Sequence, residues 1–241
     1  MNLDKLRFEV AAANRRLDAA GLVTLSFGNA SGVDRANGVL VIKPSGLACA
    51  EVQPEDLVAV ALDDGRVVEG RLRPSIDTPT HRALYLEFPD IAGVVHTHSQ
   101  AASAWAQAGR AIPALGTTHA DYFGGPVLVS RDLAAQEIEG DYEWATGQVI
   151  AATVRERGRS AVDSPAVLVR SHGPFTWGHA PMDAAEAAIA LEAVAAMAWQ
   201  TVTLEPDVAA ISVALLRRHF DRKHGAAAYY GQDRTTSEPR R

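Results

Sequence analysis

Residues 92–100 read AGVVHTHSQ, an apolar run that ends in His96 and His98. A short apolar run predicts a strand, and side chains at positions i and i+2 of a strand leave the same face of the sheet. The two imidazole rings can therefore converge on one point and bind a metal ion. Equally, both can be neutral polar side chains beside a core, and this motif alone leaves both interpretations open.

The rest of the chain alternates short apolar runs with longer amphipathic segments. Runs bounded by turn residues predict strands, and apolar residues at three- to four-residue spacing predict helices. In the helix after the first group of strands, we expect Thr78 as the N-cap and Pro79 as the first helical residue. We expect strands within residues 22–31, 38–46, 56–62, 66–70, 88–98, 126–130 and 166–178, and helices at 3–20, 78–88, 100–109, 141–158 and 182–219, the last broken near Pro206.

The early strands have hairpin-length connections, whereas a regular βαβ repeat needs a helix after each strand. The chain also lacks a GxGxxG motif after the first strand and a GxxxxGK[ST] motif. These motifs bind dinucleotides and nucleoside triphosphates through glycine-rich loops. We therefore expect an α/β fold with a helix-covered sheet that is not doubly wound, and neither of those ligand classes.

Composition narrows the function further. The 241 residues are 47% hydrophobic, which is ample for a packed core, and carry a net charge of -6. A nucleic-acid surface would need a basic stripe, so we expect no nucleic acid and a small-molecule partner instead. The one cysteine, Cys49, excludes an intrachain disulfide and fits a reducing compartment. We interpret it as a buried side chain rather than a catalytic thiol.

Neither export nor membrane insertion is expected. Residues 1–10 carry scattered charges and lack the uninterrupted apolar core of a signal peptide. The most apolar segment, residues 184–199, contains Glu186 and Glu192 and is too short to span a bilayer. The sequence therefore favours a cytoplasmic protein.

A third histidine strengthens the metal interpretation. His172 lies in VLVRSHGPF, at the end of a predicted strand, where Gly173 allows a sharp turn that can present the ring at a strand edge. Three imidazoles with one open position are what a catalytic Zn²⁺ site requires. Asp77 is a candidate fourth ligand or nearby base, although a carboxylate at this place can also serve only the N-terminus of a helix.

Several longer motifs together resemble the sugar-phosphate epimerases of the metal-dependent class II aldolase/adducin family. The resemblance covers residues 3–232 and implies one domain, 1–232, followed by a polar tail, 233–241, that we expect to be disordered. It also implies an α/β/α sandwich with a central, mostly antiparallel sheet, assembled as a cyclic homotetramer (C4) with active sites between subunits. The motifs are VTLSFGNAS (23–31), VIKPSG (41–46), DTPTHRALY (77–85), VVHTHS (94–99), IPALGTTHADYF (112–123), SHGPFTWG (171–178) and RKHGAAAYYGQ (222–232).

The resemblance implies a role for individual residues. The metal ligands would be His96, His98 and His172, with Asp77 as the acidic ligand or neighbour, and Zn²⁺ is the expected ion, with Mn²⁺ or Co²⁺ as alternatives. The residues that would bind the sugar phosphate are Gly28, Asn29, Lys43, Ser45, Gly46, Ser75 and Ile76.

Proton transfer would fall to Asp121 and Tyr230, the tyrosine reaching in from an adjacent subunit. Without the surrounding motifs, Asp121 would be an ordinary loop carboxylate and Tyr230 a packing aromatic. Three further residues coincide with active-site or supporting positions: Thr117, Glu143 and His219.

The chain departs from the family pattern at one position. Two consecutive serines are usual there, whereas this chain has Ser75 followed by Ile76. The loss of one hydrogen bond to a charged group costs about 1.5–3 kcal/mol unless another group replaces it. Because Lys43, Ser45 and Gly46 are present, we still expect the phosphate to anchor the substrate.

The implied reaction is metal-dependent interconversion of L-ribulose 5-phosphate and D-xylulose 5-phosphate, through retro-aldol cleavage between carbons 3 and 4 and re-addition, as in L-arabinose-type pentose catabolism. One alternative is a fuculose-phosphate type of aldolase, but those enzymes carry Glu at the position of Asp77 and lack the THADYF and YYGQ pairing. A second is a non-catalytic adducin-like scaffold, which lacks the metal ligands.

Overall fold

The computed structural model describes residues 3–225 and 228–229. Within these residues, one eight-stranded sheet has the order β4-β3-β2-β1-β5-β8-β7-β6. Neighbouring strands run antiparallel except β6 and β7, so the sheet is mostly antiparallel, as predicted. The strands are β1 (Asn29–Asp34), β2 (Val39–Ile42), β3 (Val58–Ala61), β4 (Val67–Glu69), β5 (Gly93–His96), β6 (Leu128–Val129), β7 (Ala166–Leu168) and β8 (Pro174–Gly178).

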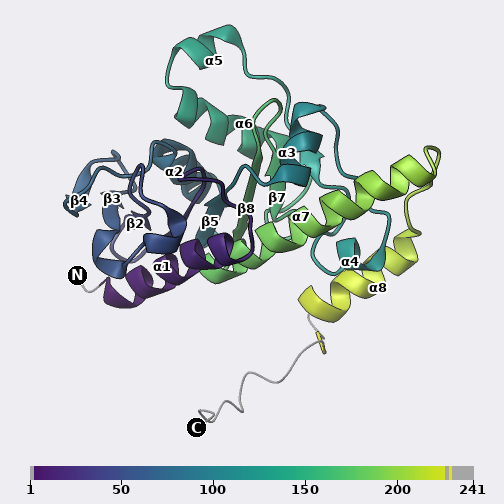
Figure 1. Cartoon of the computed structure of the whole chain (residues 1–241), viewed down its shortest axis with the longest axis horizontal. Helices are drawn as coiled ribbons and strands as arrows, with labels where there is room; N and C mark the ends of the chain where they lie inside the picture. Colours follow the sequence, from purple (N-terminus) through teal and green to yellow (C-terminus); the bar gives the residue numbers. More distant parts are fainter. Residues whose placement is uncertain (1–2, 226–227, 230–241) are drawn as a thin grey trace.

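Helices cover both faces of this sheet (Figure 1). Helices α1 and α7 lie on one face, and α2 and α6 lie on the other, which gives the expected α/β/α sandwich. The helices are α1 (Asp4–Ala19), α2 (Thr78–Glu87), α3 (Gln100–Gln107), α4 (Thr117–Ala120), α5 (Ala135–Glu139), α6 (Tyr142–Glu156), α7 (Pro181–Leu204) and α8 (Val213–His224), with 3₁₀ turns at Cys49–Glu51 and Pro54–Asp56.

The strand sequences explain why both faces need a cover. Strand β2 reads VLVI and is buried along its whole length. Leu40 and Ile42 join the cluster under α2 and α6, whereas Val39 and Val41 join the cluster under α1. Because successive side chains point to opposite faces, an unbroken apolar strand requires apolar contacts on each side.

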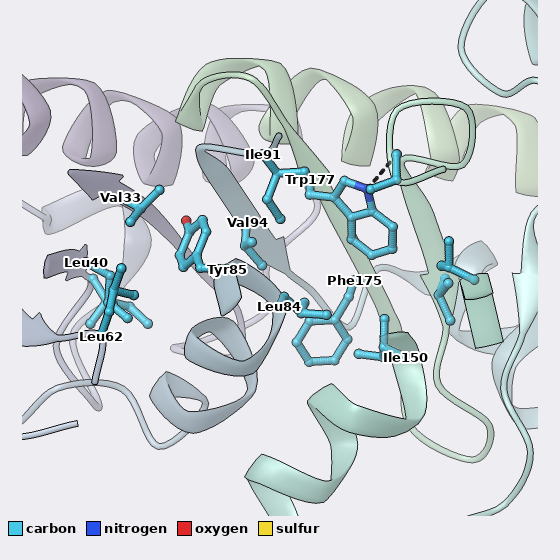
Figure 2. Close-up of a cluster of buried hydrophobic side chains, with 14 of the residues drawn as sticks. Val33, Leu40, Leu62, Leu84, Tyr85, Ile91, Val94, Ile150, Phe175 and Trp177 are labelled. Carbon is cyan, nitrogen blue, oxygen red and sulfur yellow. Dashed lines mark hydrogen bonds between the residues drawn. The ribbon is translucent and has the colours of Figure 1, made fainter. Parts of the chain in front are cut away.

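The larger cluster lies between the sheet and helices α2 and α6. Figure 2 shows Leu84 and Tyr85 of α2 facing the sheet residues Val94 and Phe175. Burial of a large apolar side chain contributes roughly 1.5–3 kcal/mol, so this layer holds α2 firmly against β5 and β8. Since the candidate metal ligand Asp77 is the N-cap residue directly before α2, packing of the core also positions the site.

Strand β5 lies in the middle of the sheet and ends at His96, the first residue of the HTH motif. In the register of β5 with its two neighbours, His96 is opposite Asn29 of β1 and opposite Phe175 of β8. Gly28 has φ +112°, and a Cβ added there would lie 3.1 Å from the carbonyl oxygen of His96. Glycine therefore allows the chain before β1 to pass close to the metal-site strand.

Some predicted boundaries are wrong. Residues 22–28 are not a strand, and β1 begins only at Asn29. Asp77, not Thr78, occupies the N-cap position of α2, and Pro79 is the second helical residue. The Thr78 hydroxyl instead donates to the carbonyl of Ser75 at 2.5 Å, which closes the preceding turn. The short helices α4 and α5 were not predicted, because four or five residues give too little periodicity to recognise.

The prediction that the apolar segment around residues 184–199 is too short to span a bilayer is also wrong. Helix α7 has 24 residues and, in the described part of the chain, is the one helix long and apolar enough to cross a membrane. Its position accounts for this composition: Ala184 and Ala188 pack against α1 and the sheet. The Glu192 carboxylate accepts from the backbone N–H groups of Ala101 and Ala102 at the start of α3. The predicted break is confirmed, since α7 ends at Leu204 and α8 begins at Val213.

Candidate active site

The three predicted histidines converge. His96 ends β5, His98 follows two residues later, and His172 lies in the connection from β7 to β8. One ring nitrogen of each lies within 4.8 Å of those of the other two. The Nε2 atoms of His96 and His98 are 3.0 Å apart, and two nitrogens bound to one tetrahedral Zn²⁺ lie about 3.4 Å apart. The cluster could therefore hold one divalent cation.

Contacts outside the cluster orient these rings. The Nδ1 atom of His96 donates to the carbonyl oxygen of Pro174 at 3.0 Å, and the ring stacks on Phe175 with centroids 4.2 Å apart. The hydroxyl of Tyr142 lies 3.3 Å from Nδ1 of His172. Such partners of the second ring nitrogen fix the tautomer and orientation of a metal-binding histidine. Tyr142 was not predicted, because nothing in the sequence links it to His172.

Burial keeps the cluster neutral. Burial lowers the pKa of His96 to about 3, with help from the neighbouring imidazoles and against the opposing effect of Asp77. The pKa values of His98 and His172 are also lowered, chiefly by burial. A neutral imidazole has the free lone pair that metal binding requires.

The connection that presents His172 is closely packed. Ser171 has φ +60°, so the left-handed residue of this turn is Ser171 rather than Gly173. A Cβ added at Gly173 would lie 2.8 Å from the carbonyl oxygen of Thr97. Glycine is therefore needed at position 173 for the close approach of the HTH backbone, not for a positive φ.

Asp77 lies beside the cluster. Its Oδ2 accepts from the side-chain amide of Asn29 at 2.6 Å, and the same amide donates to the Ser75 hydroxyl at 3.1 Å. Burial acts to raise the pKa of Asp77, but His96, His81 and the Asn29 hydrogen bond lower it overall. The group of mutually close ligand atoms in the described chain comprises the three histidines, so a coordinating role for Asp77 stays a prediction.

The fold also brings two of the predicted substrate loops together. The backbone N–H of Ser45 donates to the carbonyl of Arg73, and that of Ser75 donates to the carbonyl of Lys43, at 2.9 and 3.0 Å. The Lys43 side chain is buried, and its ammonium group donates to the carbonyls of Pro44 and Leu47. Burial accordingly lowers the pKa of Lys43.

The remaining substrate-loop residues lie at the outside of this pairing. Gly46 has φ +76°, and a Cβ added there would have nothing within 4 Å among residues 3–225 and 228–229. Ile76 is exposed, whereas its neighbour Ser75 is buried. The structure therefore leaves the Ile76 side chain free to point away from the loop contacts, and phosphate binding at this position stays a prediction.

Asp121 belongs to a second group of polar residues, between α4 and α8. Its carboxylate accepts from Nδ1 of His219 at 3.0 Å and from two nitrogens of Arg222 at 3.0 and 2.8 Å. Burial acts to raise the pKa of Asp121, but Arg222 and His219 lower it overall. Arg222 was not predicted, although it begins the RKHGAAAYYGQ motif.

The other predicted residues have varied surroundings. Thr117 is exposed at the start of α4. Glu143 lies in the first turn of α6, and its backbone carbonyl accepts from the Thr80 hydroxyl at 2.6 Å. Tyr230 lies outside the described residues, as do the tail 233–241 and the predicted domain boundary.

Some buried polar side-chain atoms of the described residues lack a hydrogen-bond partner. Within the described residues they are Asn29 Oδ1, His81 Nε2 and Ser103 Oγ. The Asn29 amide donates a hydrogen bond to Asp77, and the charge of Asp77 acts to raise the pKa of His81. A Cβ added at Gly173 would lie 3.5 Å from Ser103 Oγ and 3.5 Å from the Cδ2 atom of His98. Buried polar atoms of this kind call for a ligand or ordered water, so the surroundings fit a metal and a polar substrate.

Comparisons with known proteins show the family to which the chain belongs. The family model described as Class II Aldolase and Adducin N-terminal domain matches residues 8–199. The chain is 50% identical over 230 residues to L-ribulose-5-phosphate 4-epimerase UlaF of Salmonella paratyphi A, which covers 95% of this chain and 100% of that protein. The protein of the same name from Salmonella typhi matches to the same extent.

Solved structures share the fold. An L-fuculose 1-phosphate aldolase is similar with a TM-score of 0.75 at 22% identity, over 91% of this chain and 96% of that chain. The l-fuculose-1-phosphate aldolase from Thermus thermophilus gives a TM-score of 0.62 at 27% identity, over 86% of this chain and 99% of that chain. With its fold, its histidine cluster and the match to residues 8–199, the chain belongs to the class II aldolase and adducin N-terminal domain family.

Proposed function

We propose that this chain is a metal-dependent L-ribulose-5-phosphate 4-epimerase that interconverts L-ribulose 5-phosphate and D-xylulose 5-phosphate. The observation that carries the proposal is the 50% identity to UlaF over the whole length of that protein. The converged histidines support it, because a scaffold without catalysis has no need for three neutral imidazoles with one ring nitrogen of each within 4.8 Å of those of the others.

The histidine cluster would hold the metal, with Zn²⁺ the expected ion for a set of imidazole ligands. When bound, such an ion supplies Lewis-acid stabilisation of negative charge on the substrate's carbonyl and hydroxyl oxygens. Asp77 would complete the site as a ligand or as the acceptor that orients Asn29, whose amide donates to it at 2.6 Å.

The paired loops would bind the phosphate. Ser45 and Ser75 carry hydroxyl groups on adjacent segments, and backbone N–H groups of Gly46 and Ile76 are further candidate donors. We assign Lys43 to shaping the loop, since its ammonium group already donates to two carbonyls of that loop. Within the described residues, the Asn29 Oδ1 atom lacks a partner and would be available to a substrate hydroxyl.

The chemistry follows from the position of the inverted carbon. Carbon 4 is not adjacent to the ketone, so its hydrogen is not acidic and direct deprotonation is unfavourable. Cleavage between carbons 3 and 4, rotation of the aldehyde and re-addition to its other face invert the centre. The carbon-4 hydroxyl must lose and regain its proton on opposite sides, which we assign to Asp121 and Tyr230, each contributing ~10²–10⁴ in rate.

The metal cluster of one subunit and the proton-transfer residues of its neighbour would meet at the interface between subunits of a homotetramer. Asp121 directly follows α4 and His219 lies in α8, whereas the metal cluster comes from the end of β5, the residues just after it and the β7–β8 connection. No residue of α8 is buried in the described chain, and Val213 is 64% exposed. A neighbouring subunit that covers this helix would bury its apolar residues. The cytoplasm is the expected location, where sugar phosphates are available.

A coupled assay tests the proposal. The protein is incubated with L-ribulose 5-phosphate, and D-xylulose 5-phosphate is measured with and without a chelator. The epimerase assignment predicts chelator-sensitive formation of D-xylulose 5-phosphate. Accumulation of aldehyde fragments would instead identify an aldolase, the activity named for the structural neighbours, and no turnover of any pentulose phosphate would contradict catalysis on this substrate class.

A further inference from the structure

Helix α8 holds the Asp121 carboxylate with a fork of two hydrogen bonds. Nε of Arg222 donates to Oδ1 at 3.0 Å, and Nη2 donates to Oδ2 at 2.8 Å. Both side chains are largely shielded from solvent, with 25% of Arg222 and 19% of Asp121 exposed. Two parallel bonds from a planar guanidinium fix the plane of a carboxylate, which a single contact does not.

The remaining polar neighbours of Asp121 do not replace this fork. His219 shares Oδ1 with Arg222 at 3.0 Å. His224 donates to the backbone carbonyl of Asp121 at 2.8 Å, and Lys223 lies over the Tyr122 ring at 3.5 Å from its centroid. Among these neighbours, Arg222 is the donor to Oδ2, and it carries a full positive charge.

The same turn of α8 leads to the second residue assigned to proton transfer. The backbone carbonyl of Arg222 accepts from the N–H of Tyr229 at 3.0 Å, and Tyr229 directly precedes Tyr230 in the chain. Arg222 thus contacts Asp121 through its side chain and the segment before Tyr230 through its backbone.

We propose that Arg222 is a positioning residue for proton transfer, which fixes the orientation of the Asp121 carboxylate from the last turn of α8. The inference rests on the proposed function, because it requires Asp121 to take part in the reaction. The positive charge of Arg222 also favours the ionised carboxylate, since Arg222 and His219 together lower the pKa of Asp121 against the effect of burial. An ionised carboxylate is the form that can accept the hydroxyl proton.

A purely structural role would have a different signature. Because no residue of α8 is buried within the part of the chain that the structure describes, the Arg222–Asp121 pair also attaches this helix to the end of α4. Loss of attachment alone would lower the melting temperature without moving the pH dependence of catalysis. The test must therefore measure both.

Arg222→Gln removes the charge and the fork, and Arg222→Lys keeps the charge but cannot form two parallel bonds. Arg218, exposed on the same helix, provides the matched controls Arg218→Gln and Arg218→Lys. We expect Arg222→Gln to lower kcat by on the order of 10- to 100-fold with little change in KM. In the plot of kcat/KM against pH, the fall in activity on the acidic side should begin at higher pH for Arg222→Gln. The reason is that the pKa of Asp121 rises when the positive charge of Arg222 is lost.

Arg222→Lys should lower kcat but shift the acidic side of the pH profile less, because it keeps the positive charge. The Arg218 variants should have the kcat and pH profile of the unaltered protein. Metal content should stay constant throughout. The inference is overturned if Arg222→Gln retains the original kcat and pH profile, or if it lowers only the melting temperature. Asp121→Asn separates the two proposals: normal turnover by that variant overturns the role of Asp121 itself, whereas an inactive Asp121→Asn beside a fully active Arg222→Gln overturns only the role of Arg222.

Discussion

The imidazole of His96 donates through Nδ1 to the carbonyl oxygen of Pro174, 3.0 Å away on the neighbouring strand β8. A carbonyl oxygen can only accept, so Nδ1 carries the proton and Nε2 presents its lone pair to His98. Pairing of two central strands thereby sets the tautomer of a metal ligand before any ion binds. Preorganisation of this kind lowers the conformational cost of metal binding.

Tyr142→Phe tests the corresponding contact on His172. The variant removes the hydroxyl that lies 3.3 Å from Nδ1 and leaves the ring stacked near the histidine. We expect metal affinity to fall by about 10- to 100-fold, as is typical when such an orienting partner is lost. Competition with a chromogenic chelator measures the affinity, and unchanged affinity would show that the hydroxyl does not orient His172.

Gly173→Ala should disturb the site through sterics alone. The added Cβ would lie 2.8 Å from the Thr97 carbonyl oxygen, in the backbone between the two ligands of the HTH motif. We expect the variant to lose metal affinity and to be destabilised by roughly 1–3 kcal/mol, in the range of overpacking.

Gly116→Ala is the matched control for this variant. A Cβ at Gly116 would have no atom of the described residues within 4 Å, and the backbone there has φ -150°, which any residue adopts. Thermal unfolding and metal titration of both variants give the comparison. Equal behaviour of the two would refute the close-approach explanation for Gly173.

Buried His81 predicts a loss of stability in mild acid. Its Nδ1 lies 2.7 Å from the Ser31 hydroxyl, and burial lowers its pKa to about 4 from an ordinary value of 6.5. Above pH 6.5 the group is neutral in both folded and unfolded chains. As the pH falls from 6.5 towards 4, only the unfolded chain binds the proton, so the free energy of unfolding should decrease, by up to about 3 kcal/mol for this group.

Urea unfolding of metal-free protein between pH 8 and pH 4 measures this effect. Loss of the buried hydrogen bond should make His81→Gln less stable at pH 8, and its stability should fall less steeply with acid. His179→Gln, the same change at an exposed histidine, is the control for replacing a histidine as such. A slope unchanged in His81→Gln would contradict the assignment.

The central part of the site could be predicted from local sequence. Apolar residues before HTH predict β5, and the rings of His96 and His98 do meet, but β5 ends at His96, so His98 reaches its partner from just beyond the strand. The histidine after the β7 run joins them because β8 pairs with β5, a relationship that the two neighbouring strand patterns allow but do not prove. Resemblance to the family supplied that last step.

Contacts between distant segments could not be predicted in the same way. Tyr142 is 30 residues from His172, and Arg222 is 101 residues from Asp121, so no local pattern connects either pair. The buried ammonium of Lys43 is a similar case. A KPSG turn typically lies at the surface, and only the chain folding back on Pro44 and Leu47 buries the lysine.

The most direct test of the account is the metal content of the purified protein and of a His172→Asn variant, measured by elemental analysis after purification without chelator and normalised to chain concentration. The account predicts one divalent ion per chain in the unaltered protein, its loss in the variant, and a parallel loss of turnover on L-ribulose 5-phosphate. A protein that turns over this substrate without a divalent ion, or a His172→Asn variant that keeps both its ion and its activity, would contradict the claim that these three imidazoles hold the catalytic metal.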